Sequence, residues 1–200
     1  MNRANTLFYR TIKTSGDYTF ALVFLVAASP LMLLISIIIL LTDGWPVIYS
    51  QKRTGLKGQS FLIYKFRSLK HGISEGTDLI SDIHDPRVTK AGRVMRKYRI
   101  DEIPNLINVL KGEMSVVGPR PEQRYYIDKL VLHEPRYNEL LKIKPGVTSW
   151  GEIKYGYAST VEQMTERLKY DLYYLENRSF AFDMKIIFRT ILIVLKGRGI

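Results

Sequence analysis

Two adjacent carboxylates, Asp101 and Glu102, follow a stretch of chain that carries only positive charges. Between Arg87 and Arg99 the chain contains no acid and four cations, which are Lys90, Arg93, Arg96 and Lys97. We expect Asp101 to cap a helix that runs to about Lys111, because aspartate is a favoured N-cap residue. The positive helix end and the nearby arginines should then lower the pKa of Asp101.

This pair and its surrounding cations could act on phosphorus. An aspartate that is ionised at neutral pH can attack an activated phosphorus atom. Glu102 can help to hold Mg²⁺, which usually takes one or two carboxylates together with phosphate oxygens. Arginine suits phosphate oxygens, and the candidates are Arg87, Arg96, Arg99 and Arg120. On these residues alone, an acidic helix cap with a solvated glutamate remains the alternative.

The composition narrows the class of partner. The 200 residues suit one modest domain, and the formal net charge of +11 favours polyanions, namely nucleic acid, anionic lipid head groups or phosphorylated small molecules. The chain has no cysteine, which excludes disulfides, thiolate chemistry and cysteine metal sites.

An apolar segment near the N-terminus predicts membrane association. No charged residue occurs from Tyr18 to Thr42, and this length of helix is enough to cross a bilayer. Ser29-Pro30 lies near its middle, where proline removes a backbone N–H and disfavours helix at the preceding serine. Because cations flank both ends, we expect a re-entrant helical hairpin bent at Ser29 and Pro30, with both ends cytoplasmic. A kinked crossing helix is the alternative.

The remaining elements are short. VIYSQ and FLIYKFRS flank a turn with Gly55 and Gly58, which predicts a β-hairpin. Residues 70 to 86 read as a surface loop, and PGVTSWGEIKYGY from Pro145 as turn and short strand. Ser159 and Glu162 predict a capping box for the helix that follows. Further helices are expected from Thr89 to Arg99, Glu122 to Leu132, Pro135 to Leu141, and over MKIIFRTILIVLKGRG, which suits either a core or a membrane-interface helix.

Several blocks of this chain, taken in order, resemble the bacterial sugar transferases. These are the monotopic phosphoglycosyl transferases that start glycan assembly on polyprenol phosphate. The resemblance covers nearly the whole chain, including the apolar segment broken by Ser-Pro. The blocks are KFRS at 65 to 68, DPRVTKAG from Asp85, RIDEIPNLINVLKGEMSVVGPRPE from Arg99, RYNELLKIKPGVT from Arg136 and YDLYYLENRSFAFD from Tyr170.

The resemblance implies a mechanism. Asp101 would attack the β-phosphorus of a UDP-sugar, releasing UMP, and undecaprenol phosphate would then take the phosphosugar as the first step of bacterial glycoconjugate or polysaccharide assembly. Mg²⁺ would assist, with Glu102 and Asp101 as its protein ligands. Arg96 and Arg120 would hold phosphates, whereas structural roles are equally expected for Arg67 and Arg87.

The family resemblance also implies an architecture. The expected fold is α+β and mostly helical, with residues 1–45 as basic N-terminus and re-entrant membrane helix. Residues 46–200 would form the catalytic domain, with interfacial amphipathic helices around a cytosolic active site. The active site and both termini would face the cytoplasm at the inner membrane, with membrane lipids as partners and no nucleic acid. A homodimer is left open.

One departure concerns the segment after PGVT. Many family members continue with G-x-A-Q-V-x-G-R, whose arginine faces the nucleotide sugar, whereas here Gly156 falls at that position. Either Lys154 or Tyr157 substitutes for this arginine, or the contact is absent. The sugar is not specified by the sequence, and the alternative function is a non-enzymatic basic module that binds anionic lipid or nucleic acid at a membrane.

Overall fold

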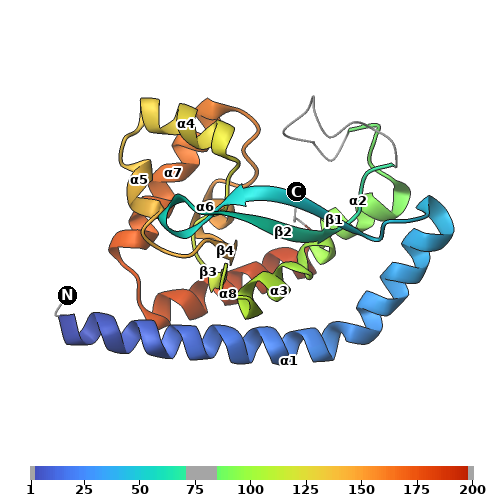
Figure 1. Ribbon diagram of the computed structural model, residues 1–200, viewed down its shortest axis with the longest axis horizontal. Helices are drawn as coiled ribbons and strands as arrows, with labels where there is room; N and C mark the ends of the chain where they lie inside the picture. Colours follow the sequence, from blue (N-terminus) through green and yellow to red (C-terminus); the bar gives the residue numbers. More distant parts are fainter. Residues whose placement is uncertain (1–2, 71–84, 198–200) are drawn as a thin grey trace.

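The computed structural model describes residues 3–70 and 85–197, and it is mostly helical with two small two-stranded sheets (Figure 1). This agrees with the predicted α+β class. The loop expected between residues 70 and 86 falls almost entirely outside the described residues. The helices are α1 Arg3–Asp43, α2 Lys90–Lys97, α3 Asn105–Leu110, α4 Arg124–His133, α5 Tyr137–Leu140, α6 Trp150–Lys154, α7 Val161–Glu176 and α8 Phe180–Leu195.

The apolar segment belongs to α1, a single helix of 41 residues that contains Pro30 and bends in its C-terminal part (Figure 1). The helix continues through the Ser29-Pro30 step, so this step does not interrupt it. The Ser29 hydroxyl donates to the Val26 carbonyl at 2.8 Å, and so satisfies the oxygen that proline leaves without its N–H partner. By length and composition, Tyr9–Asp43 could cross a membrane.

Partly buried hydrogen bonds join the first part of α1 to the rest of the molecule. Tyr9 and Lys13 both donate to one carboxylate oxygen of Asp183, at 3.0 and 2.9 Å. One turn further on, Asp17 accepts hydrogen bonds from the Ser115 hydroxyl at 2.6 Å and from the Val116 backbone N–H at 3.2 Å. The helix therefore contacts the folded body from Tyr9 onward.

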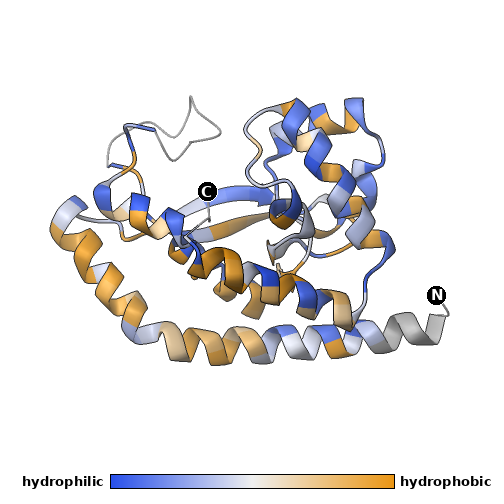
Figure 2. Ribbon diagram, turned by 180° about the vertical axis from the view of Figure 1, so that it is seen from behind, coloured by the Kyte–Doolittle hydropathy of each residue, from blue (hydrophilic) through white to orange (hydrophobic). Residues whose placement is uncertain are grey.

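The second part of α1 returns to the same body. Ile35 and Ile39 are buried in a cluster with Val47, Phe66 and Met95. The outward side of the helix is exposed and apolar, and includes Leu22, Val23, Val26, Leu33, Leu34 and Leu41. Apolar residues gather on α1 and on α8 beside it (Figure 2).

The predicted hairpin is confirmed. Strands β1 (Ile48–Thr54) and β2 (Ser60–Phe66) are antiparallel, with Ile48 opposite Phe66, and the short 3₁₀ helix η1 (Leu56–Gly58) joins them. Asn108 of α3 fixes this hairpin from below, because its fully buried amide accepts from the Tyr64 N–H and donates to the Leu62 carbonyl. The hairpin thus gives α3 and the segment before it a fixed neighbour.

The second sheet pairs two of the sequence blocks that carry the family resemblance. Strand β3 (Ser115–Val117) is parallel to β4 (Gly146–Thr148), with Val117 opposite Thr148. The two segments approach so closely at Gly146 that a Cβ there would lie 2.1 Å from the Gly118 nitrogen. Only glycine fits at this position between the two segments, so the GPRP and PGVT blocks pack directly against each other.

Helix α7 begins one residue later than its predicted capping box. Thr160, rather than Ser159, is the N-cap, and Gln163 is its reciprocal partner instead of Glu162. Both candidate pairs obey the spacing rule, and the start of the helix decides between them. Met164, Leu168 and Leu172 on one side of α7 are buried in a cluster with residues of α4 and α5.

The last helix, α8, buries only Asp183 and Ile186. Its exposed apolar residues include Phe180, Met184, Phe188, Ile191 and Leu195. Of the two alternatives open for this segment, the exposed apolar face favours an interfacial helix over a core helix.

Candidate active site

The carboxylate pair lies between two helices and does not cap either of them. Ile100–Glu102 form the 3₁₀ helix η2, and α3 begins after Pro104, whose position at the N-cap provides no side-chain hydrogen bond. The predicted role of Asp101 as the N-cap is therefore wrong. Arg99 adopts the left-handed conformation (φ 53°), which is unusual for a residue with a side chain. This turn separates α2 from η2.

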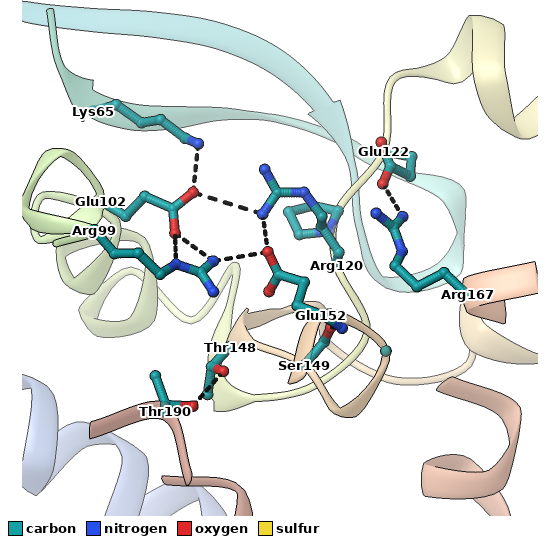
Figure 3. A network of polar contacts seen from close by, with 12 residues as sticks. Lys65, Arg99, Glu102, Arg120, Glu122, Thr148, Ser149, Glu152, Arg167 and Thr190 are labelled. Carbon is teal, nitrogen blue, oxygen red and sulfur yellow. Dashed lines mark hydrogen bonds and ion pairs between the residues drawn. The ribbon is translucent and has the colours of Figure 1, made fainter. Parts of the chain in front are cut away.

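Glu102 is held by cations that come from three parts of the chain (Figure 3). Its Oε1 accepts from Lys65 Nζ at 2.6 Å and lies 3.6 Å from Arg120 Nη1. Its Oε2 accepts from Arg99 Nη2 at 2.7 Å and from Arg99 Nε at 3.1 Å. Burial alone would raise the pKa of Glu102, but Arg99, Lys65 and Arg120 outweigh it and hold the pKa well below its usual value.

Asp101 is equally buried, at 6% exposed, but its carboxylate forms no hydrogen bond or ion pair with the residues that the structure describes. Burial raises the pKa of Asp101, Lys65 and Arg96 oppose this rise, and the neighbouring charge of Glu102 adds to it. The predicted lowering of this pKa is therefore wrong. The helix end expected to stabilise the ionised form begins further along the chain, and desolvation dominates.

The pairing of β3 with β4 and the turn that follows β3 determine the position of Arg120. Gly118 donates to the Thr148 carbonyl at 3.1 Å, and Gly146 donates to the Pro119 carbonyl at 2.9 Å. From this rigid turn the Arg120 guanidinium reaches Glu102 and Glu152, and its role in binding phosphate stays a prediction.

Two other predicted phosphate ligands, Arg96 and Arg87, have side-chain partners outside the carboxylate pair. Arg96 is buried on α2 and donates to the Ser68 hydroxyl at 3.0 Å. Its positive charge opposes the rise in the pKa of Asp101. Arg87 binds the carboxylate of Asp85, whose pKa it lowers to about 2 through that hydrogen bond. Their roles in binding phosphate stay predictions.

Arg67 binds the C-terminal end of α1. Its Nη2 donates to the carbonyl oxygens of Asp43 at 2.7 Å and Gly44 at 2.5 Å, and these are the last groups of α1 and the turn after it. A cation at a helix C-terminus is stabilising. Among the two roles left open for Arg67, these contacts favour the structural one.

The segment after PGVT contains a helix that we did not predict, α6. Its last residue, Lys154, is exposed and lies over the Trp150 ring at 5.0 Å from the centroid. Gly156 has φ +91°, with open space where a Cβ would point. Tyr157 is more buried: burial raises its pKa, while Arg120 and Arg96 lower it. Of the two candidate substitutes for the family arginine, Tyr157 is the one whose pKa responds to Arg120 and Arg96, and the role of either residue in place of that arginine stays a prediction.

Sequence reasoning missed several residues that build this centre. Lys65 lies within KFRS and Glu152 within SWGEIKYGY, and no role was assigned to either. A second buried cluster joins Glu122 to Arg167 at 2.5 Å and to Arg53 at 3.2 Å. The sequence signal for this second cluster was Glu122, the acid that follows Pro-Arg-Pro. A glutamate that is buried in a rigid turn needs a cationic partner, so its position could have indicated an ion pair.

The donor set suits a divalent cation that gains other ligands from a diphosphate. Asp101 and Glu102 offer two adjacent carboxylates, and Mg²⁺ commonly takes one or two. Among residues 3–70 and 85–197 no cluster of three or more acidic or histidine side chains forms a complete protein-only site. A bound Mg²⁺ would therefore share these carboxylates with the phosphate oxygens of a substrate.

Comparison with known proteins matches almost the whole chain, including every residue of this centre, to one family. The family model described as bacterial sugar transferase matches residues 8–197. A UDP-N-acetylgalactosamine-undecaprenyl-phosphate N-acetylgalactosaminephosphotransferase of Aeromonas hydrophila is 38% identical over 96% of this chain and 45% of its own length. A UDP-glucose:undecaprenyl-phosphate glucose-1-phosphate transferase of Escherichia coli K12 is 37% identical over 91% of this chain and 40% of its own length.

A shorter relative matches along most of both chains. The uncharacterized sugar transferase EpsL of Bacillus subtilis is 37% identical over 94% of this chain and 90% of its own length. The chain thus spans less than half of the first two relatives and nearly all of the third.

Proposed function

This chain belongs to the bacterial sugar transferase family, and we propose that it transfers a phosphosugar from a UDP-sugar to undecaprenol phosphate and releases UMP. The observation that carries this proposal is the buried carboxylate of Asp101. It has no hydrogen-bond or ion-pair partner in the described part of the chain, and it lies among cations beside a fully paired Glu102. A nucleophile must be free to reach its target, and a phosphate needs cations around it.

The reaction has two displacements at one phosphorus. An Asp101 carboxylate oxygen attacks the β-phosphorus of the UDP-sugar, the bond from this phosphorus to the bridging oxygen breaks, and UMP leaves with that oxygen. An oxygen of undecaprenol phosphate then attacks the aspartyl phosphosugar, and the bond between the phosphorus and Asp101 breaks to restore the carboxylate. Because the covalent intermediate divides the transfer, the two anionic substrates need not bind together.

The cations around Glu102 support the charge that develops on the phosphates. Lys65 and Arg120 lie on the side of Glu102 Oε1, and Arg99 holds Oε2, so Glu102 is fixed in place. Mg²⁺ held by Asp101 and Glu102 would shield the negative charge of the diphosphate. Preorganised cations of this kind lower the barrier because they need no rearrangement during the reaction.

The contacts of α1 with the body support a placement of the protein on one side of the membrane. Tyr9 and Lys13 bind Asp183 near its start, and Arg67 binds the carbonyl oxygens at its end. A helix that crossed a bilayer would carry its two ends to opposite sides, whereas both ends of α1 lie on one body. This supports a monotopic protein whose α1 and α8 enter one leaflet by their exposed apolar faces, with both termini and the active site cytoplasmic.

The test is a nucleotide-release assay. Purified protein with undecaprenol phosphate and Mg²⁺ is given UDP-glucose, UDP-galactose, UDP-N-acetylglucosamine and UDP-N-acetylgalactosamine in turn. We expect UMP from at least one donor, and the gain of one phosphosugar mass on Asp101 when the acceptor is omitted. The panel is needed because the two relatives above are named for different sugars. UDP as the product would instead indicate an ordinary glycosyl transferase.

A further inference from the structure

Glu152 occupies a rigid place on α6. The Ser149 hydroxyl caps this helix by accepting from the Glu152 backbone N–H at 2.9 Å. The preceding N–H, of Gly151, donates to the buried carboxylate of Asp171 at 3.0 Å. The backbone that carries Glu152 is therefore held by side chains from two directions.

The carboxylate of Glu152 shares its partners with Glu102 (Figure 3). Its Oε1 accepts from Arg99 Nη2 at 2.7 Å and also from Arg120 Nη1. The same Arg99 Nη2 lies 2.7 Å from Glu102 Oε2, and the same Arg120 Nη1 lies 3.6 Å from Glu102 Oε1. Two acids and two arginines thus form a closed ring, with Glu102 on the side of Asp101.

The ring explains why an acid is present at this position. The side chains of Arg99 and Arg120 are 14% and 17% exposed, so water alone does not solvate them. Glu152 Oε2 is buried and accepts no hydrogen bond from any described residue, which costs stability. A residue that served only to fill space would not need a buried charge. The charge is needed to hold both guanidinium groups.

We propose that Glu152 is a positioning residue for the reaction, which acts through Arg99 and Arg120 to fix Glu102 beside the nucleophile. The inference rests on the function proposed above. Without this carboxylate, Arg99 and Arg120 would retain only Glu102 as a common partner, and each guanidinium would be free to take other rotamers. Misplacement of a catalytic group by about 1 Å can cost on the order of 100-fold in rate.

Two variants separate shape from charge. Glu152→Gln keeps the size of the side chain and removes its charge, whereas Glu152→Asp keeps the charge on a shorter side chain. We expect kcat for UMP release to fall roughly 10- to 100-fold in E152Q, with KM for the UDP-sugar changed less than about threefold. E152D should recover part of kcat. The matched control is E166Q, because Glu166 pairs with Lys169 on the exposed surface of α7.

A double-mutant cycle tests whether Glu152 acts through Arg99. If it does, E152Q should lower kcat much less in an Arg99→Lys protein than in the wild type, because the link is already broken. Fully additive effects would overturn the proposal. So would a wild-type kcat in E152Q, or a change confined to KM, which would indicate direct binding of the donor.

A spectroscopic measurement keeps this inference separate from the proposed function. The Nε–H group of Arg99, labelled with ¹⁵N, reports its ion pairs with or without turnover. We expect its signal to shift and to exchange faster with water in E152Q, and to stay unchanged in E166Q. If the wild type releases no UMP, the proposed function fails and the catalytic role of Glu152 fails with it, while this signal still decides whether Glu152 holds Arg99 in place. An Arg99 signal that does not respond to E152Q overturns it.

Discussion

Asp101 and Glu102 are neighbours in the chain and almost equally buried, yet of the two only Glu102 is paired with residues that the structure describes. Glu102 accepts hydrogen bonds from Lys65 and Arg99, whereas no residue in the described ranges donates to the Asp101 carboxylate. An unpaired buried carboxylate is unfavourable for folding, since burial penalises its charge. The fold therefore retains at Asp101 a group that helps it little, which is typical of a residue kept for chemistry.

Asp101→Asn should abolish turnover without loss of stability. The amide cannot attack phosphorus, so UMP release should fall by at least about 1,000-fold. Because burial raises the pKa of Asp101, the neutral amide should leave the free energy of unfolding equal or higher at pH 7. Activity and thermal denaturation in detergent are the measurements. Near wild-type activity in D101N would remove Asp101 from the mechanism.

Glu102→Gln should lower both activity and stability. A neutral amide leaves Lys65, Arg99 and Arg120 facing one another with one fewer acid, and breaking a buried ion pair in this way costs about 3 kcal/mol. Denaturant unfolding of E102Q beside D101N measures the contrast. Equal stability of the two variants would contradict the different pairing of the two carboxylates.

The sequence predicted the hairpin and named the carboxylate pair and the arginines as candidates, because each depends on a local pattern or on a specific block of residues. It did not predict Lys65 and Glu152 as members of the centre. Lys65 lies 37 residues from Glu102, and Glu152 lies 53 residues from Arg99, so only the packing of β2 and α6 brings them together. No local rule reports a contact of this kind.

The two errors at Asp101 are connected. An acid before a helical pattern fits the rule for an N-cap, and the lowered pKa was derived from that helix end together with the nearby arginines. The structure inserts η2 and Pro104 before α3, so the carboxylate faces the buried centre instead of the helix end. Desolvation, which raises the pKa of Asp101, depends on burial in the tertiary structure and cannot be predicted from a local sequence pattern.

Asp171 should make stability fall as pH rises. Burial raises its pKa from 3.8 to about 7 against the influence of Arg167, so between these values the folded chain binds more protons than the unfolded chain. Its contribution to the free energy of unfolding should therefore decrease by up to about 1.4 kcal/mol per pH unit over this window. In Asp171→Asn this slope should vanish. Denaturant unfolding of both proteins from pH 4.5 to 8 checks it, and parallel curves would refute the raised pKa.

Tyr157 and Lys154 should differ in their effect on donor binding. Tyr157→Phe removes a hydroxyl that lies near Arg120 and Arg96, and we expect KM for the UDP-sugar to rise about 3- to 10-fold, the value of one hydrogen bond. Lys154→Met should leave KM unchanged, because the Lys154 ammonium lies over Trp150 at the surface. Steady-state kinetics of the two variants decide the matter, and the reverse order would assign the contact to Lys154.

Both ends of α1 should be reached by reagent from the same side of the membrane. The chain has no cysteine, so each introduced thiol is unique. Thr14→Cys lies on the exposed surface of α1 before its apolar part, and Lys52→Cys lies exposed on β1 after it. A membrane-impermeant maleimide should label both variants in inside-out vesicles and neither in intact spheroplasts. Val26→Cys, in the apolar part, should resist labelling from either side, because ionised thiolate is rare within lipid. Labelling of T14C and K52C from opposite sides would establish a crossing helix, and the contacts of Lys13 with Asp183 and of Arg67 with the end of α1 could then not coexist in the membrane.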